Sequence, residues 1–118
     1  MILVGLGGSL GAASRYGIGI WITKKIGKKF PYATLLINMA GSFLLGILSS
    51  LYLSHSISEW VWLLFGIGYC GAFTTFSTFG YEAIQLLLER RKREGLLYIS
   101  SSIILCTMTA YIGILITI

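Results

Sequence analysis

One eleven-residue segment, residues 70–80, combines residue types that could hold an ion. It reads Cys-Gly-Ala-Phe-Thr-Thr-Phe-Ser-Thr-Phe-Gly, with two glycines, four hydroxyls and three phenylalanines inside a long apolar stretch. This composition disfavours an uninterrupted helix, and broken backbone within a membrane is tolerated only where protein or a water-filled cavity surrounds it. We predict a break at about residues 71–78, where freed carbonyls and amides could bind an ion.

Neutral hydrogen-bond donors accompany this segment elsewhere in the chain. Asn38 offers two donors and one acceptor oxygen, and the ring edges of Phe76 and Phe79 carry partial positive charge. An anion that has lost its water needs replacement donors of this kind. Simpler explanations remain open, because an amide within a membrane commonly hydrogen-bonds a neighbouring helix. Serine and threonine hydroxyls often bond their own helix backbone.

Arg15 stands near the middle of the first apolar stretch. A guanidinium there is costly and usually faces a cavity or a partner. We predict that Arg15 lies in an electropositive vestibule that attracts anions. The alternative is that it extends toward the membrane boundary, since Lys24 is only nine residues further on.

Residue types that serve catalysis are scarce, so we predict that the protein is not an enzyme. The only histidine, His55, lies in a short connection, and no paired carboxylates occur within the apolar stretches. Cys70 and Cys106 both fall in apolar stretches, where cysteine usually acts as a small packing residue. Two such residues define neither a disulfide framework nor a metal centre.

The composition indicates a membrane protein built from helices. Of 118 residues, 56% are hydrophobic and 11% are charged, whereas soluble domains are about a quarter charged. The apolar stretches 2–23, 33–53, 60–88 and 96–118 are each long enough to cross the hydrocarbon, which takes about 20 residues. We predict an all-α membrane protein, a single domain of four transmembrane helices with the third helix broken. The first stretch lacks the basic leader of a signal peptide and is expected to be retained.

The basic residues form two clusters on the same side of the predicted bundle. One cluster follows the first stretch and the other follows the third, whereas the connection at residues 54–58 has none. The positive-inside rule then places both clusters in the cytoplasm, with both termini outside a multi-pass plasma-membrane protein. The net charge of +5 is therefore no sign of nucleic-acid binding. The clustered residues are Lys24, Lys25, Lys28, Lys29, Arg90, Arg91, Lys92 and Arg93.

Three motifs resemble the Fluc (CrcB) family of fluoride channels. Residues 7–16 read Gly-Gly-Ser-Leu-Gly-Ala-Ala-Ser-Arg-Tyr, which is similar to the signature of that family's first helix. Residues 33–38, Ala-Thr-Leu-Leu-Ile-Asn, with Gly-Ser-Phe at 41–43, resemble its second helix. Residues 71–79 resemble the break in its third helix. The matches occur in the family's order, and the resemblance covers all four predicted spans.

The resemblance implies an antiparallel dimer with two fluoride pores along the subunit interface. The chain would be a subunit of a passive, fluoride-selective channel that exports cytoplasmic fluoride. By position, Phe76 and Phe79 would line the pore. Asn38 would donate to the ion, and Arg15 would lie in an aqueous vestibule. The family's polar track is similar here to Thr34, Ser77, Thr78, Tyr98 and Ser102.

The resemblance also implies a structural sodium ion at the centre of the dimer. Backbone carbonyls at the helix break would hold it, and the similar positions are Gly71 and Thr74. The expected partners are therefore fluoride, sodium, membrane lipids and a second channel subunit, with no nucleic acid.

The charge bias departs from many members of that family, which insert in both orientations because their bias is weak. Eight basic residues on one side favour a fixed orientation. A heterodimer with a partner subunit of opposite orientation is therefore favoured, and a homodimer is the alternative.

Two other functions fit a small four-span protein. A small multidrug-type transporter needs a membrane-embedded carboxylate in its first helix to exchange protons for cations. The first stretch contains Arg15 but no acid. A non-transporting assembly subunit needs only packing faces, which leaves the polar break unexplained.

Overall fold

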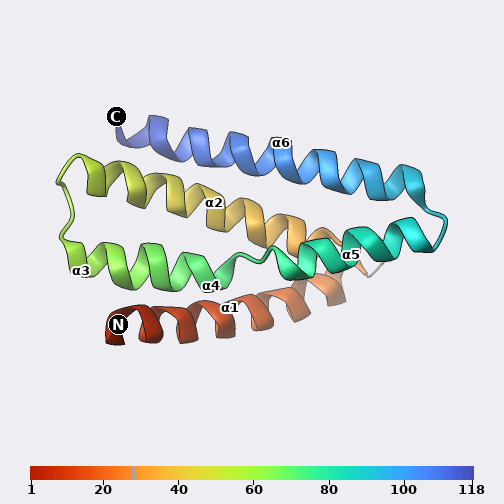
Figure 1. Ribbon diagram of the computed structural model, residues 1–118, viewed down its shortest axis with the longest axis horizontal. Helices are drawn as coiled ribbons and strands as arrows, with labels where there is room; N and C mark the ends of the chain where they lie inside the picture. The colour runs from red at the N-terminus through yellow and green to blue at the C-terminus, as the bar shows by residue number, and fades with distance from the viewer. Residues whose placement is uncertain (28) are drawn as a thin grey trace.

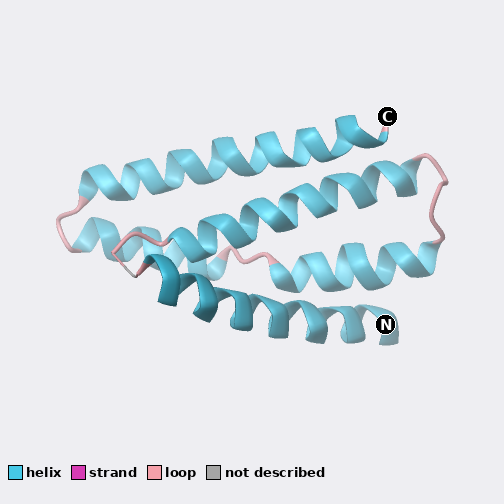
Figure 2. Ribbon diagram, turned by 180° about the vertical axis from the view of Figure 1, so that it is seen from behind, coloured by secondary structure: helices cyan, strands magenta, loops and turns pink. Residues whose placement is uncertain are grey.

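The computed structural model describes residues 1–27 and 29–118, and every regular element in these residues is helical (Figure 2). Single long helices, and shorter helices joined end to end, form columns. These columns lie roughly side by side, with both termini at the same end of the bundle (Figure 1). The longest dimension is 48 Å. The elements are α1 (Ile2–Ile26), α2 (Tyr32–Leu53), α3 (Glu59–Val61), the π-helix η1 (Trp62–Cys70), α4 (Gly71–Phe73), α5 (Ser77–Leu88) and α6 (Lys92–Thr117).

Three of the described segments are long and apolar enough to cross a membrane. They are α2, the column at residues 59–88, and α6. Helix α1 has 25 residues, which is sufficient length, but it does not meet the same hydropathy criterion because it contains Arg15 and several glycines. The all-helical prediction is confirmed, whereas a crossing by α1 stays a prediction.

The surface of the bundle is strongly apolar. Leu10, Ile84 and Ile104, from three different columns, each expose more than half of their area. Extended apolar surface of this kind marks contact with a membrane or a protein. The buried core is small by comparison, and its main cluster consists of Leu35, Ala83, Leu86 and Tyr98.

Glycines set the distance between neighbouring columns. A Cβ atom on Gly7 in α1 would collide with the carbonyl oxygen of Leu64 in η1. A Cβ atom on Gly46 in α2 would collide with the carbonyl oxygen of Ala110 in α6. Small residues allow this close approach where van der Waals packing holds helices together. Packing therefore explains Gly7, whereas a Cβ atom on Gly5 would meet no atom within 4 Å.

The third column along the chain, residues 59–88, changes helix type before it breaks. It starts with α3 and continues as η1, a nine-residue π-helix, a rare form that often occurs at functional sites. The sequence did not predict it. Gly71 keeps helical angles, φ −61° and ψ −35°, and the first extended residue is Thr74, with φ −79° and ψ 156°. The interruption covers residues 74–76, less than the expected 71–78, because glycine lowers helix propensity without forbidding helical angles.

Candidate functional site

The side chain of Asn38, in α2, holds the backbone of the break. Its Nδ2 donates to the carbonyl oxygen of Thr75 at 3.0 Å. The backbone N–H of Thr75 donates to Asn38 Oδ1 at 2.9 Å. Both main-chain groups of Thr75 are thus satisfied in a region where an unpaired backbone group is costly. We call this pair of hydrogen bonds the Asn38–Thr75 clamp.

The clamp redirects backbone donors that a continuous helix would use. In an α-helix, the N–H of Thr75 would donate to the carbonyl of Gly71, and the N–H of Thr78 to that of Thr74. Instead, the N–H of Thr75 donates to Asn38. The N–H of Thr78 donates to Thr75 Oγ1 at 3.2 Å, as at a helix N-cap. The carbonyl oxygens of Gly71 and Thr74 therefore lose their usual helical donors.

A pocket of about 470 Å³ lies between α1, α2 and α5, and we call it the arginine pocket. The Nε atom of Arg15 is buried and has no hydrogen-bond partner within the described part of the chain. The structure thus places Arg15 at the wall of a cavity. The polar and charged residues that line this pocket are Arg15, Tyr16, Thr23, Lys24, Thr34, Thr75, Thr78 and Glu82.

A second pocket, of about 320 Å³, lies between α2, the break and α6, and we call it the phenylalanine pocket. The ring centroids of Phe76 and Phe79 lie 5.9 Å apart at its wall. Ser102 is only 7% exposed, and its Oγ finds no hydrogen-bond partner in residues 1–27 and 29–118. Among the described residues, no lysine, arginine, aspartate or glutamate lines this pocket. Its lining residues are Asn38, Ser42, Leu45, Thr74, Thr75, Phe76, Phe79, Ser102, Ile103 and Cys106.

Two residues of the expected polar track line neither pocket. Tyr98 is fully buried, its ring centroid lies 5.1 Å from that of Phe79, and its hydroxyl donates to Glu82 Oε1 at 3.2 Å. Ser77 is exposed, with its Oγ 3.4 Å from Thr75 Oγ1. Tyr98 therefore links the pockets from within the core, because it contacts Phe79 of one and Glu82 of the other.

Sequence reasoning assigned no role to Thr75, which both pockets share. A usable signal was present, since a threonine three residues before Thr78 matches the spacing of an N-cap. Phe76 projects outward from the same break and is 83% exposed in the single chain. Thr75 thus lines the two pockets of the bundle, whereas its neighbour Phe76 is largely exposed on the outer surface.

Comparison with known proteins gives consistent matches along the chain. A family model described as CrcB-like protein, Camphor Resistance (CrcB), matches residues 2–114. A fluoride-specific ion channel FluC of Thermus thermophilus is 40% identical, over 95% of this chain and 88% of that protein. Proteins of the same name from Shewanella frigidimarina and Acidobacterium capsulatum are 44% and 38% identical, each over 96% of this chain and 91% of its own length.

Proposed function

This chain belongs to the CrcB family, and from that premise we propose that it is a subunit of a passive, fluoride-selective channel. In this role it exports cytoplasmic fluoride across the plasma membrane. It is a membrane-spanning protein with long apolar helices, and its family is one of ion channels and not of enzymes. Its relatives are named fluoride-specific ion channels, which supports fluoride as the transported ion.

The observation that carries the proposal is the Asn38–Thr75 clamp at the wall of the phenylalanine pocket. Asn38 has two amide hydrogens, and the clamp uses one of them. The other is available to an ion in the pocket that Asn38 lines. The buried hydroxyl of Ser102 is a second donor without a partner among the described residues. Such donors can replace the water of a small anion.

We propose that the two pockets are successive parts of the anion path. Arg15 and Lys24 would attract the anion into the arginine pocket. Hydroxyls there, from Thr34 and Thr78, begin the replacement of water. The remaining donors and the ring edges of the phenylalanine pocket complete it. Ser77 and Tyr98 line neither pocket, and their membership of the polar track stays a prediction.

A structural sodium ion is part of the proposal. No group of three His, Cys, Asp or Glu side chains suited to a metal occurs within residues 1–27 and 29–118. The redirected donors at the break support a different ligand type, the carbonyl oxygens of Gly71 and Thr74. Free carbonyls at a helix break are suited to sodium. The positive charge of the ion would hold the helix breaks of the two subunits together, and the ion would take no part in selecting fluoride.

The site is incomplete in one chain, which supports a dimer. Phe76 is 83% exposed although it lines the phenylalanine pocket. We propose that an antiparallel second subunit covers it and completes two pores at the interface. The eight basic residues on one side favour a different chain of opposite orientation. This subunit would have its basic loops in the cytoplasm and both termini outside.

Liposome efflux tests the function directly. The chain is reconstituted alone and together with a candidate partner, and fluoride release is followed with an electrode under a fluoride gradient. We expect release with the partner that needs neither ATP nor a proton gradient and that excludes chloride. Full efflux from the chain alone would contradict the heterodimer and leave the channel standing. Absence of efflux from folded protein in every combination, or drug–proton exchange instead, would overturn the channel.

A further inference from the structure

One end of the bundle carries more positive charge than the protein balances. We call it the basic end and define it as Lys24, Lys25, Lys29, Arg90, Arg91, Lys92 and Arg93. These residues come from the end of α1, the connection to α2, the turn between α5 and α6, and the first two residues of α6. All of them are exposed except Arg91, which is half-buried.

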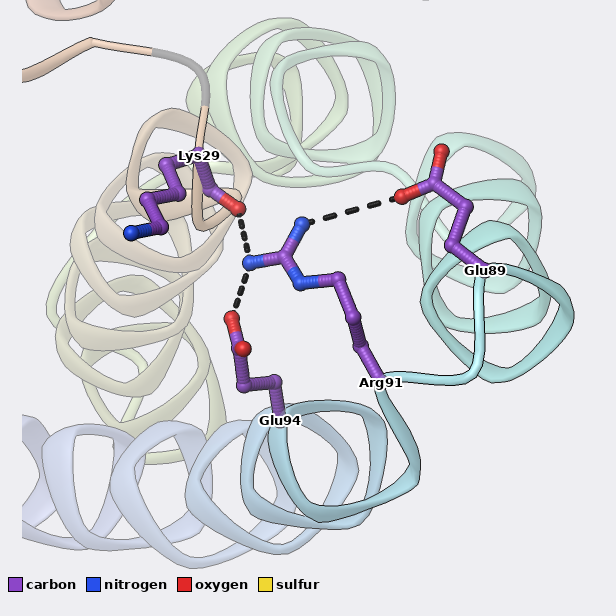
Figure 3. Close-up of polar contacts among 4 residues, drawn as sticks. All are labelled: Lys29, Glu89, Arg91 and Glu94. Atoms are coloured by element: carbon purple, nitrogen blue, oxygen red, sulfur yellow. Dashed lines mark hydrogen bonds and ion pairs between the residues drawn. The ribbon is translucent and has the colours of Figure 1, made fainter.

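Arg91 joins the two connections that form the basic end (Figure 3). Its Nη2 donates to the backbone carbonyl of Lys29 at 2.5 Å, across 62 positions of sequence. The same nitrogen donates to the carboxylate of Glu94, and Nη1 lies 3.7 Å from Glu89 Oε1. The hydrogen bond that Arg91 donates to Glu94 is the main cause that raises the pKa of Arg91. Two basic clusters far apart in sequence thus form one surface.

Arg91 also forms ion pairs with the acidic side chains at the basic end. Glu89 and Glu94 both pair with it. In the part of the chain that the structure describes, the other six basic residues have no carboxylate within 4 Å. Among the described residues, six exposed cations at this end therefore form no direct ion pair with the protein's own carboxylates.

We propose that the basic end binds the headgroups of anionic phospholipids, on a surface that Arg91 assembles from both connections. The cations lie at the ends of α1 and α6, where membrane-spanning helices meet the headgroups, and clusters of Lys and Arg there attract anionic lipid. Trp21, 62% exposed and one turn before Lys24, marks the same level, because tryptophan prefers the membrane interface. The positive-inside rule explains the side of the membrane but not what balances the charge. The proposal rests on membrane insertion and not on fluoride conduction.

The tryptophans allow a local test. Trp21 lies at the basic end, whereas Trp60 and Trp62 begin the third column at the opposite end. Trp60→Phe/Trp62→Phe reports on the basic end, and Trp21→Phe reports on the other. Each protein is placed in vesicles with brominated phosphatidylglycerol or brominated phosphatidylcholine. We expect quenching of Trp21 to show about fivefold preference for phosphatidylglycerol at low ionic strength, which falls toward one in high salt. Trp60 and Trp62 should show none.

Matched variants show whether the charges act by their position. Lys92→Gln/Arg93→Gln should bring the preference at Trp21 close to one. Ser54→Glu/Ser56→Glu changes the net charge equally at the opposite end and should leave it near fivefold. The proposal would be overturned by equal quenching of Trp21 by both lipids in the Trp60→Phe/Trp62→Phe protein. It would also be overturned if Lys92→Gln/Arg93→Gln left the lipid preference at Trp21 unchanged. Loss of the preference in inorganic phosphate, but not in chloride of equal ionic strength, would identify a phosphate site and overturn the lipid assignment.

Discussion

The arginine pocket and the phenylalanine pocket share Thr75 but differ in charge. Arg15, Lys24 and Glu82 line the first, whereas no ionisable Lys, Arg, Asp or Glu of the part of the chain that the structure describes lines the second. Charged groups attract ions over a distance but distinguish poorly among anions. Oriented neutral donors act only at contact and favour an ion that fits them. The difference suggests that attraction and selection occur in separate places, with Thr75 at the boundary.

The largest effect should follow from a charge at this boundary. Asn38→Asp removes the N–H that donates to the carbonyl of Thr75 and adds negative charge to a pocket that has none. A hydrogen bond involving a charged group is worth up to about 3 kcal/mol, so fluoride efflux should fall about 100-fold. Ser54→Asp, at the end of α2, adds the same charge away from both pockets and should retain efflux. Near-parental efflux from folded Asn38→Asp would refute the role of the clamp.

The next effect concerns the aromatic wall. Phe76→Ile and Phe79→Ile should each lower fluoride efflux about 10-fold, because aromatic contacts contribute up to about 1.5 kcal/mol beyond area. Thermal melting should separate the two variants. Phe76 is exposed in the single chain, so its variant should melt like the parent when the subunit is measured alone, whereas Phe79→Ile loses the contact with Tyr98. Phe65→Ile, in η1, is the control. Unchanged efflux from both pocket variants would remove the aromatic wall from the selective region.

A smaller effect should follow from the unpartnered hydroxyl. Ser102→Ala removes one neutral donor, worth about 1 kcal/mol, and should lower fluoride efflux about fivefold at any ionic strength. The melting temperature should stay the same or rise, since Ser102 Oγ has no partner among the described residues to lose. Ser101→Ala, whose hydroxyl bonds its own helix, should leave efflux unchanged. A fall in melting temperature for Ser102→Ala would mean that the hydroxyl serves packing.

The smallest effect should belong to the charged pocket. Arg15→Gln should lower efflux about threefold at low ionic strength and hardly at all near 1 M salt, where the Debye length is about 3 Å. Arg15→Lys keeps the charge and should stay close to the parent. The ratio of fluoride to chloride flux should not change in either variant. A loss of fluoride selectivity in Arg15→Gln would show that the arginine pocket also selects among anions, so that attraction and selection would not be separate.

Sequence reasoning recovered the helical class, the family and the location of the break. Residue types were sufficient for this, because glycines and hydroxyls in an apolar stretch are unusual in any context. It did not predict the partners of individual side chains. Asn38 and Thr75 are 37 positions apart, and helical spacing places a residue on a face without saying what that face meets.

Tyr98 illustrates the same difficulty. The family resemblance implied that it shares a polar track with Ser102. In the structure Ser102 lines the phenylalanine pocket, whereas Tyr98 is wholly buried between Phe79 and Glu82. A large ring fills the core, and only its hydroxyl is polar. Side-chain volume, which a periodicity argument omits, therefore decides between pocket and core.

The clamp resembles the pairing of two β-strands more than contact between two helices. Asn38 presents to Thr75 the same donor and acceptor that a neighbouring strand would present. Its side-chain amide contacts only main-chain atoms of Thr75, so these two hydrogen bonds do not depend on the side chain at position 75. Position 38 has no such freedom, since aspartate lacks the donor, leucine lacks both groups and glutamine is one methylene longer. Mutational scanning should therefore find position 38 less tolerant than position 75, where the side chain matters only as the acceptor for the N–H of Thr78.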